Sequence, residues 1–255
     1  MKILVKLGGT LLDDAGSRER LSREIASVAK AAHTVVVHGG GKQMTRFLAE
    51  RGIESRFVNG LRVTTPEILD AVLKIFAGSV NAGLVSALRA AGARPVGLTG
   101  LDAGLVDAEP LDPDLGHVGK PVHSDPRLLE LLVRERYLPV VACVAGDANG
   151  GIYNVNGDRM AVACACAFRA DKLIFLTDVD GVRDGGGAVR ETLRASEARS
   201  LIEQGVATGG MQAKLEAALA GLQQGLVEVL IAPGFQPGAL EKIINSARIG
   251  TALIH

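Results

Sequence analysis

Aromatic side chains are scarce in this 255-residue chain, which has no tryptophan, two tyrosines and six phenylalanines. Proteins that hold single-stranded nucleic acid commonly stack the bases on aromatic side chains. The chain also lacks an excess of either charge, because 28 basic and 28 acidic residues cancel. Without a net field it does not attract nucleic acid or anionic membranes. We therefore expect neither as a partner, and any anionic ligand must be held by local groups.

Cysteine and long apolar runs are also limited. Cys143, Cys164 and Cys166 form an odd set without metal-ligand spacing, and we expect all three to be ordinary core residues. Gly, Arg, Asp or Lys interrupts each apolar run before about 20 residues, the length that crosses a bilayer. The first apolar run begins at Ile3, which leaves no room for a signal peptide. We expect a water-soluble, cytoplasmic protein.

Short apolar runs alternate with amphipathic stretches along the chain, a pattern typical of an α/β protein with a parallel sheet and crossover helices. The expected strands are Ile3–Leu7, Thr34–His38, Arg94–Thr99, Leu138–Val144, Lys172–Thr177, Val227–Ile231 and Ala252–Ile254. The expected helices are Arg18–Ala31, Gln43–Arg51, Pro66–Ala91, Asp125–Arg136, Asp158–Ala167, Ala195–Gln204, Gly210–Gln224 and Gly238–Asn245. Gly100–His123 and Ala145–Val155 interrupt the alternation and are predicted to form hairpins or flaps at the mouth of a cleft.

Glycine-rich turns follow the first two predicted strands, as Gly8-Gly9 and as Gly39-Gly40-Gly41. Glycine lets backbone N–H groups approach an anion closely, and a following helix N-terminus adds a favourable dipole. One such turn is commonly only a tight turn, but two at the carboxyl edge of a parallel sheet favour a phosphate site. Gly41-Lys42 is followed by Gln43, so the Walker A pattern is not matched, and no G-x-G-x-x-G occurs.

Two lysines and two acidic segments are candidates for the same site. Lys6 lies inside an apolar strand, where its ammonium needs an anion unless it reaches solvent from an edge strand. Lys214 lies near the start of a helix, where a cation opposes the helix dipole. Asp158 is a candidate ligand-site carboxylate or simply an N-cap. The segment 178–183 follows an apolar strand, so its carboxylates either cap a helix, stabilise a turn or face a nucleotide.

These motifs together resemble the amino acid kinase family over nearly the whole chain and in the expected order. The quoted segments are Lys6-Leu7-Gly8-Gly9, His38-Gly39-Gly40-Gly41, Asn59-Gly60-Leu61-Arg62-Val63-Thr64, Gly116-His117-Val118-Gly119, Asn154-Val155-Asn156-Gly157-Asp158, Thr177-Asp178-Val179-Asp180-Gly181 and Gly210-Met211 with Lys214. Asn-Gly-Leu-Arg-Val-Thr is the most diagnostic, since it points to the branch that phosphorylates N-acetyl-L-glutamate.

The resemblance implies the carbamate kinase-like fold, a three-layer α/β/α sandwich around a largely parallel sheet with two lobes. Residues 1–170 would bind the amino-acid substrate and form a homodimer, and residues 171–255 would bind ATP. The implied reaction is ATP- and Mg²⁺-dependent phosphorylation of the side-chain carboxylate of N-acetyl-L-glutamate in arginine biosynthesis. That carboxylate is already ionised at neutral pH, so no general base is needed. We accordingly expect His38 and His117 to be structural.

The resemblance also implies roles for individual residues, each carried over by its place in a motif. Lys6 and Lys214 would neutralise the transferring phosphoryl group, and Asp158 would orient both lysines. Substrate would be bound by Gly40, Gly41, Arg62 and Asn154. ATP and its phosphates would be bound by Gly8, Gly9, Asp178, Val179, Asp180, Gly181, Val182, Arg183, Val206, Ala207 and Thr208. No protein ligand is implied for Mg²⁺, which the ATP phosphates would hold.

Two departures from the family pattern leave alternatives open. Ala82 stands where many relatives have lysine, and Gly157 replaces a more usual alanine. The resulting motif, Asn156-Gly157-Asp158, is similar to that of relatives that phosphorylate aminoadipate or glutamate attached to an acidic carrier protein. A non-catalytic, effector-binding regulator on the same fold is a third hypothesis. The chain starts at its first strand, without the extra N-terminal helix of arginine-inhibited hexameric members, so a dimer that tolerates arginine is expected.

Overall fold

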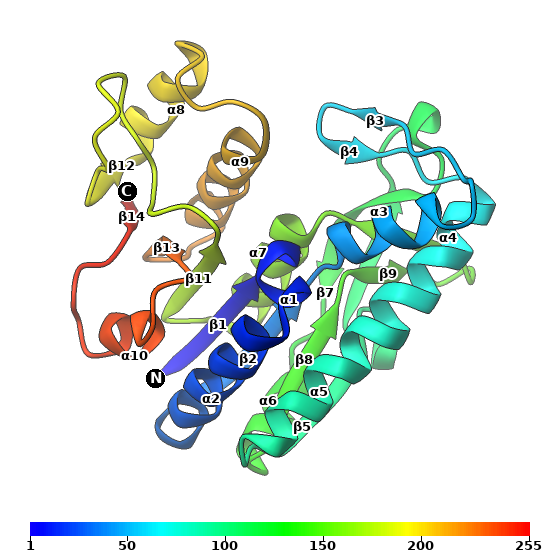
Figure 1. The fold of residues 1–255 in the computed structure, drawn as a ribbon, viewed down its shortest axis with the longest axis horizontal. Helices are drawn as coiled ribbons and strands as arrows, with labels where there is room; N and C mark the ends of the chain where they lie inside the picture. Colours follow the sequence, from blue (N-terminus) through cyan, green and yellow to red (C-terminus); the bar gives the residue numbers. More distant parts are fainter.

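The computed structural model describes residues 1–255 and contains one large sheet. Its strands are β1 (Lys2–Leu7), β2 (His33–His38), β5 (Pro95–Thr99), β8 (Leu138–Ala142), β11 (Lys172–Thr177), β12 (Thr192–Arg194), β13 (Val229–Pro233) and β14 (Thr251–Ile254). They lie in the order β12-β14-β13-β11-β1-β2-β8-β5 (Figure 1). Only the β13–β14 pair is antiparallel. The prediction of a largely parallel sheet is confirmed.

The residues of β1 alternate between two hydrophobic cores. Ile3, Val5 and Leu7 belong to one cluster, whereas Leu4 belongs to the other. Successive side chains of a strand point to opposite faces, so a strand covered on both faces needs apolar residues at nearly every position. Lys6 shares the face of Leu4 and is the buried polar residue of this strand.

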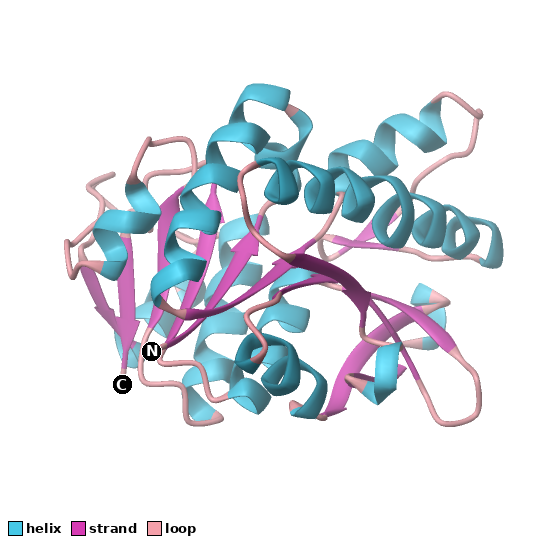
Figure 2. Ribbon diagram, turned by 90° about the horizontal axis from the view of Figure 1, so that it is seen from below, coloured by secondary structure: helices cyan, strands magenta, loops and turns pink.

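Helices cover both faces of the sheet and complete the three-layer sandwich (Figure 2). The face of Ile3 is covered by α1 (Gly9–Asp13), α2 (Ala15–Ala31), α5 (Asn81–Ala90) and α10 (Ala239–Ile244). The face of Leu4 is covered by α3 (Gly41–Ala49), α4 (Pro66–Val72), α6 (Arg127–Arg134), α7 (Gly157–Phe168), α8 (Ala195–Glu203) and α9 (Gly209–Gln223). The predicted α/β/α architecture is therefore correct.

A long helical segment runs from α4 through a π-helix, η1 (Leu73–Val80), into α5. By length and composition, residues 66–90 could cross a membrane, so the expectation that no run of this length exists is wrong here, although charges and glycines do interrupt it. Its charged residues are Glu67, Asp70, Lys74 and Arg89, and Asp70 pairs with Lys74 one turn apart. Core helices of water-soluble proteins meet the same criterion, and Val72, Leu84 and Leu88 are buried against the sheet layers.

The two irregular regions form the predicted hairpins. Strands β6 (Val106–Pro110), β7 (Val118–Ser124), β9 (Val144–Gly146) and β10 (Ile152–Val155) make a small second sheet that closes into a barrel. A further hairpin consists of β3 (Phe57–Val58) and β4 (Leu61–Arg62), beside α3 in Figure 1. The short 3-10 helices η2 (Asp102–Gly104) and η3 (Pro113–Leu115) flank β6. These regions lie beyond one end of the large sheet.

Most predicted elements are present within a few residues of their expected ends. The predicted strand Leu138–Val144 is two strands, because Cys143 separates β8 in the large sheet from β9 in the small one. The helix α1 and the strands β3, β4 and β12 were not predicted. Each has five residues or fewer, which is too short to show a helical or strand period.

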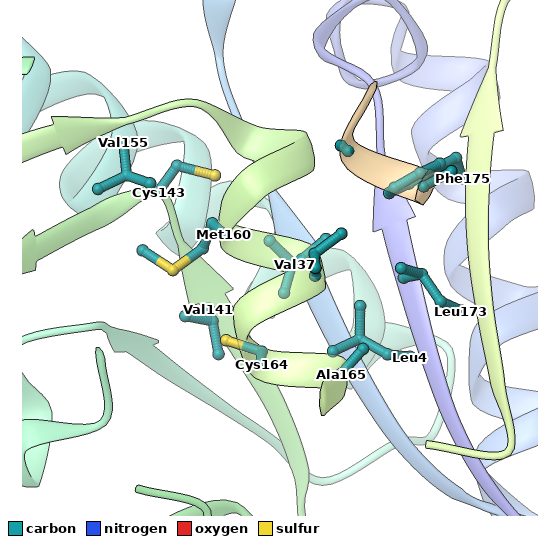
Figure 3. Packing of buried hydrophobic residues seen from close by; sticks show 14 of the residues in the cluster. Leu4, Val37, Val141, Cys143, Val155, Met160, Cys164, Ala165, Leu173 and Phe175 are labelled. Carbon is teal, nitrogen blue, oxygen red and sulfur yellow. The ribbon is translucent and has the colours of Figure 1, made fainter. Parts of the chain in front are cut away.

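The three cysteines pack as core residues, as expected. Cys143 and Cys164 are fully buried and Cys166 is half-buried. Figure 3 shows Cys143 and Cys164 among Val141, Val155 and Met160, where α7 packs on the sheet. Burial raises the pKa of Cys143 to about 12 and that of Cys166 to about 11, so neither thiol is ionised near neutrality.

Candidate active site

The two glycine turns meet at the carboxyl ends of β1 and β2, which are neighbours in the sheet. A side chain cannot fit between them, because a Cβ added to Gly9 would lie 3.0 Å from the backbone nitrogen of Gly41. The turns begin α1 and α3, and no loop hydrogen bond within the protein uses the N–H of Gly9, Gly40 or Gly41. These donors are available to an anion.

Asp158 lies between the two predicted catalytic lysines. Its Oδ1 is 2.6 Å from Lys6 Nζ, and its Oδ2 is 3.5 Å from Lys214 Nζ. Lys6 and Asp158 are 7% and 4% exposed. Burial alone would raise the pKa of Asp158, but the two lysines offset this and hold it below its usual value. The cluster holds two cations and one anion in a desolvated place, so it carries an excess positive charge.

The secondary structure explains why these three side chains meet. Lys6 points from β1 toward the face that α7 covers, and Asp158 lies in the first turn of α7. Asn156 is the N-cap of α7, and its Oδ1 accepts hydrogen bonds from the N–H groups of Asp158 and Arg159. The N-cap reading of Asp158 is thus wrong, and its carboxylate is left to hold the lysines. Lys214 reaches the cluster from the second turn of α9.

Gly157 gives room for this arrangement. A Cβ at this position would lie 3.2 Å from Lys6 Cε and 3.3 Å from Cys143 Sγ, both tight contacts. An alanine would press on the stem of Lys6 unless Cys143 or Lys6 shifted. The departure from the family pattern at Gly157 therefore has a packing reason in this chain.

A cavity of about 210 Å³ adjoins the lysine cluster. It is lined by Lys6, Gly9, the Gly39–Gly41 turn, the tip and second strand of the β3–β4 hairpin, Phe76, Val118, Cys143 and the segment 154–157. Predicted substrate-binding residues Gly40, Gly41, Arg62 and Asn154 all line it. The structure therefore brings these four residues and Lys6 to one cavity.

Arg62 is buried without a carboxylate partner. It is 8% exposed, and its guanidinium donates to Thr45 Oγ1 at 2.8 Å, to the Gly41 carbonyl oxygen at 3.4 Å and to Ser55 Oγ. It also lies 4.6 Å from the ring centre of Phe57. Burial lowers the pKa of Arg62, which reflects the cost of holding its charge away from water. All these partners are neutral, so the guanidinium favours an anionic ligand in the cavity.

Asn154 lies on β10 across the cavity from the glycine turns. Its Nδ2 donates to Thr64 Oγ1 at 3.0 Å, and that hydroxyl donates to the Arg62 carbonyl oxygen at 2.9 Å. These bonds connect β10 to the hairpin that carries Arg62. They fix the orientation of the Asn154 amide at the edge of the cavity.

The predicted nucleotide segment 178–183 begins at the end of β11, next to β1. Partial burial would raise the pKa of Asp178. Hydrogen bonding to its own backbone, to Thr10 and to Thr177 outweighs this effect, and the charge of Lys214 adds to it, so the pKa lies below its usual value. Asp178 therefore lies close to the lysine cluster. Val179 and Asp180 are exposed, and Arg183 pairs with Asp180 at 3.2 Å.

Not every predicted nucleotide-binding residue has a free group to offer. Val182 is fully buried, its N–H donates to Thr251 Oγ1, and its carbonyl accepts from Arg190. Gly181 (φ 155°) packs against Thr251 so closely that a Cβ would lie 2.7 Å from its hydroxyl oxygen. Ala207 is 4% exposed, and its N–H donates to the Leu201 carbonyl. These residues shape the loop more than they present polar groups.

The other residues predicted to bind ATP or its phosphates lie at or near the surface, at the carboxyl end of the large sheet. Val206 and Thr208 are exposed, directly before α9. Gly8 is half-buried, but its N–H donates to the Leu176 carbonyl oxygen at 3.1 Å. Gly9 is thus the member of the first turn whose N–H is available to a ligand. Across the whole chain, no three His, Cys, Asp or Glu side chains converge in a way that could hold a metal ion.

Several residues around the site were missed by sequence reasoning. Thr45 and Ser55 hold Arg62, Thr10 lies beside Asp178, and Asn81 bonds His38. These are short polar residues in helices and loops, where nothing in a single sequence separates them from solvated ones. The expectation that His38 is structural is consistent with its geometry, because it is fully buried and burial lowers its pKa to about 4.

The site as a whole is built to bring anions together. Two lysines, a buried guanidinium and unused backbone N–H groups converge, and the buried carboxylate among them, Asp158, is occupied by the lysines. No His-based acid or base faces the cavity. Phosphoryl transfer to an acceptor that is already ionised needs positioning and charge neutralisation, and these groups supply both. The fold and the site define a phosphotransferase that acts on small anions.

Comparison with known proteins agrees with this class. The model of the amino acid kinase family matches residues 1–233, so the chain belongs to the amino acid kinase family. A relative from Solibacter usitatus, named acetylglutamate kinase, is 62% identical over 255 residues, covering 100% of this chain and 99% of the relative. The acetylglutamate kinase of Koribacter versatilis is 42% identical over 258 residues, with coverage of 100% and 99%.

Solved structures share the fold. A protein of Streptococcus mutans UA159, smu.665, superposes with a TM-score of 0.84 at 29% identity and covers 99% of this chain and 98% of its own. N-acetylglutamate synthase from Neisseria gonorrhoeae, complexed with coenzyme A and N-acetyl-glutamate, gives a TM-score of 0.89 at 25% identity. That match covers 100% of this chain and 59% of the synthase chain.

Proposed function

We propose that this chain uses ATP to phosphorylate the side-chain carboxylate of N-acetyl-L-glutamate, giving N-acetyl-L-glutamyl 5-phosphate, a step of arginine biosynthesis. The observation that carries the proposal is the buried Lys6–Asp158–Lys214 cluster beside a cavity that contains the unpaired Arg62. Close relatives over the full length of the chain are acetylglutamate kinases.

In the proposed reaction the lysines neutralise the phosphoryl group as it moves from ATP to the acceptor carboxylate. Asp158 keeps both ammonium groups in place and prevents their mutual repulsion from separating them. The N–H groups of Gly9, Gly40 and Gly41 donate to phosphoryl oxygens. Each group acts on charge that is greatest in the transition state, which is where electrostatic stabilisation accelerates a reaction.

Arg62 and Asn154 hold the amino-acid substrate in this scheme. A guanidinium offers a planar pair of N–H donors that matches the α-carboxylate of the substrate. Asn154 carries an amide that can bond the polar acyl end. The cavity of about 210 Å³ has room for a small acylated amino acid but not for a nucleotide as well.

ATP would lie at the carboxyl ends of β11 and β13, against the 178–183 loop and the residues before α9. This division gives residues 1–170 to the amino-acid substrate and residues 171–255 to the nucleotide. Mg²⁺ would arrive with ATP and be held mainly by its phosphates, because the buried carboxylate of this site, Asp158, is occupied by lysines. When bound, Mg²⁺ supplies further neutralisation of phosphate charge.

The assembly and location are part of the same proposal. Only 39% of the most apolar window of the 66–90 helix is buried within one chain. A second copy that packs on the remaining apolar surface would form a two-fold dimer. We propose a cytoplasmic homodimer, and light scattering of the purified protein tests its mass.

A carrier-linked aminoadipate or glutamate kinase is the main alternative, because it would use the same lysine cluster. A non-catalytic effector-binding protein is a further alternative, since the Neisseria gonorrhoeae synthase has this fold and was solved with N-acetyl-glutamate. Intact Lys6, Asp158 and Lys214 favour a catalyst over a regulator.

The test is an ATP-turnover assay with N-acetylglutamate, glutamate and aminoadipate in parallel, with and without Mg²⁺. We expect turnover with N-acetylglutamate only, dependent on Mg²⁺. Binding of N-acetylglutamate without turnover would support the regulator instead. Inactivity with all three free acids, together with turnover of a carrier-attached acid, would support the carrier-linked kinase.

A further inference from the structure

A buried polar pair lies on the face of the sheet opposite Lys6. His38 is the last residue of β2 and is fully buried, and Asn81 is the first residue of α5 and is 5% exposed. Asn81 Nδ2 is 2.9 Å from His38 Nε2, and His38 Nδ1 is 2.9 Å from the Gly39 carbonyl oxygen. Neither side chain lines the substrate cavity.

The partners of this pair fix where its protons are. The Gly39 carbonyl oxygen can only accept, so His38 Nδ1 carries the proton of the neutral ring. Asn81 Nδ2 is also 3.0 Å from the carbonyl oxygen of Val140, which can only accept as well. The amide nitrogen of Asn81 therefore occupies this position and donates to the lone pair of His38 Nε2.

This proton arrangement controls a peptide of the glycine turn. In a trans peptide the C=O and the following N–H point in opposite directions. With the Gly39 carbonyl held toward the His38 ring, the N–H of Gly40 points away from it, toward the cavity that Gly40 lines with Lys6. The structure contains no cis peptide that would change this relation.

Packing leaves little freedom to either end of the pair. A Cβ added to Gly97 would lie 2.2 Å from Asn81 Oδ1, so the amide fills the space above β5. A Cβ added to Gly40 would lie 2.9 Å from the Phe76 ring and 3.2 Å from Val80. Phe76 and Val80 belong to the π-helix that ends directly before Asn81. This unusual helical turn sets the register of all three residues against the glycine turn.

We propose that Asn81 is a positioning residue for phosphoryl transfer, because its amide keeps the proton of His38 on Nδ1 and thereby aims the Gly40 N–H at the transferring phosphoryl group. The inference rests on the proposed function, since it assumes that a phosphoryl group passes beside Gly40. Asn81 does not line the substrate cavity, and it acts through His38 and the Gly39–Gly40 peptide.

The first test is Asn81→Leu, which keeps a similar volume and removes the donor. We expect kcat to fall about 10- to 100-fold, less than the roughly 10²- to 10³-fold cost of removing a transition-state donor outright, because the Gly40 N–H is misplaced and not lost. The KM for both substrates should change less than about threefold, because the Gly40 N–H acts on charge that develops during transfer. Leu84→Ala is the matched control, since it weakens the packing of the same helix α5 without touching the pair.

The second test uses the wild-type protein, so it does not depend on a variant that folds. Long-range ¹H–¹⁵N NMR of histidine-labelled protein distinguishes a protonated ring nitrogen from an unprotonated one. The ring of His38 should stay neutral at pH 5.5, with its proton on Nδ1. In Asn81→Leu the Nδ1 and Nε2 shifts should move toward a mixture of tautomers.

Three outcomes would overturn the proposal. They are a proton on Nε2 of wild-type His38, an unchanged kcat in folded Asn81→Leu, and a loss of kcat in Leu84→Ala as large as that in Asn81→Leu. Wild-type turnover is measured separately with each acceptor. Absence of wild-type turnover would count against the proposed function, whereas normal wild-type turnover with unaffected Asn81→Leu would count against this inference alone.

Discussion

The two ends of the large sheet both carry clustered cations, but in different surroundings. At the carboxyl end, Lys6 and Arg62 are 7% and 8% exposed. At the amino end, a cavity of about 270 Å³ is lined by Lys30, Arg94 and Arg136, which are all exposed, and no acidic residue lines it. Strand β2 shows the same contrast, since it begins with an exposed histidine and ends with the buried His38.

The polarity of the surrounding helices explains which cluster needs a ligand. Helices α2, α5 and α6 end near the amino edge, and each has a basic residue in its last turn, Lys30, Arg89 and Arg134. Cations there complement the negative ends of the helix dipoles and water solvates them. At the carboxyl edge α3, α7 and α9 begin, so their positive ends add to the charge of the lysines. Burial and helix direction, and not the number of cations, identify the anion site.

The largest expected effect is on catalysis at the carboxyl end. Lys6→Ala and Lys214→Ala should each lower kcat by about 10³- to 10⁵-fold, as loss of a comparable phosphoryl-transfer cation does. Each removes a cation aimed at the charge of the transition state. Steady-state kinetics with circular dichroism to confirm folding checks this. A variant that keeps near-normal turnover would remove its lysine from the mechanism.

The next effect is on stability, and it compares a buried with an exposed ion pair. Asp158→Ala should lower the free energy of unfolding by about 3–5 kcal/mol, because it leaves buried ammonium groups unpaired. The exposed Lys120–Glu109 pair is of similar length, 2.8 Å, and Glu109→Ala should cost about 1 kcal/mol or less. Urea denaturation measures both. Equal losses would contradict the difference in desolvation between the two sites.

The buried His38 makes stability depend on pH. Its pKa is lowered from 6.5 to about 4 by burial, so the unfolded chain binds the proton more tightly than the folded one. Stability is therefore complete above pH 6.5 and falls as the pH drops toward 4, by about 3 kcal/mol for this group. Thermal or urea unfolding between pH 7 and 4 measures the slope. His33→Gln, at the exposed end of β2, should leave the slope unchanged, whereas a flat wild-type profile would contradict the prediction.

A smaller effect is expected for substrate binding. Arg62→Lys should raise the KM for the amino-acid substrate by about 10-fold, since an ammonium cannot reproduce the two-donor fork of guanidinium. The KM for ATP should change little. Loss of ATP binding with retained amino-acid binding would reverse the proposed roles of residues 1–170 and 171–255.

The smallest effect is expected at the amino end of the sheet. Lys30→Ala and Arg94→Ala should leave kcat and both KM values unchanged, because these exposed cations serve only helix ends and the Tyr137 ring, which lies 4.0 Å from Arg94. Stability should change by about 0.5 kcal/mol or less. A large loss of activity in either variant would show that the two ends are not functionally distinct.

Most strands and helices could be predicted from their hydrophobic periodicity, because this fold repeats one unit, an apolar strand followed by an amphipathic helix. The β3–β4 hairpin and β9 were missed or merged, because two or three residues carry no period and their pairing depends on distant segments. The apolar length of residues 66–90 was also misjudged, because the Asp70–Lys74 pair interrupts the run in sequence but occupies one face of the helix.

The sequence by itself determined the α/β architecture, the two glycine turns and the candidate residues Lys6, Asp158, Lys214 and Arg62. Strand order and helix position then decided what these residues meet. The tertiary structure assigned the cap of α7 to Asn156, left Asp158 to bridge two lysines, and placed Asn81 against His38, 43 positions away in sequence. Such contacts depend on how separate elements pack in three dimensions, and a local pattern of residue types does not predict them.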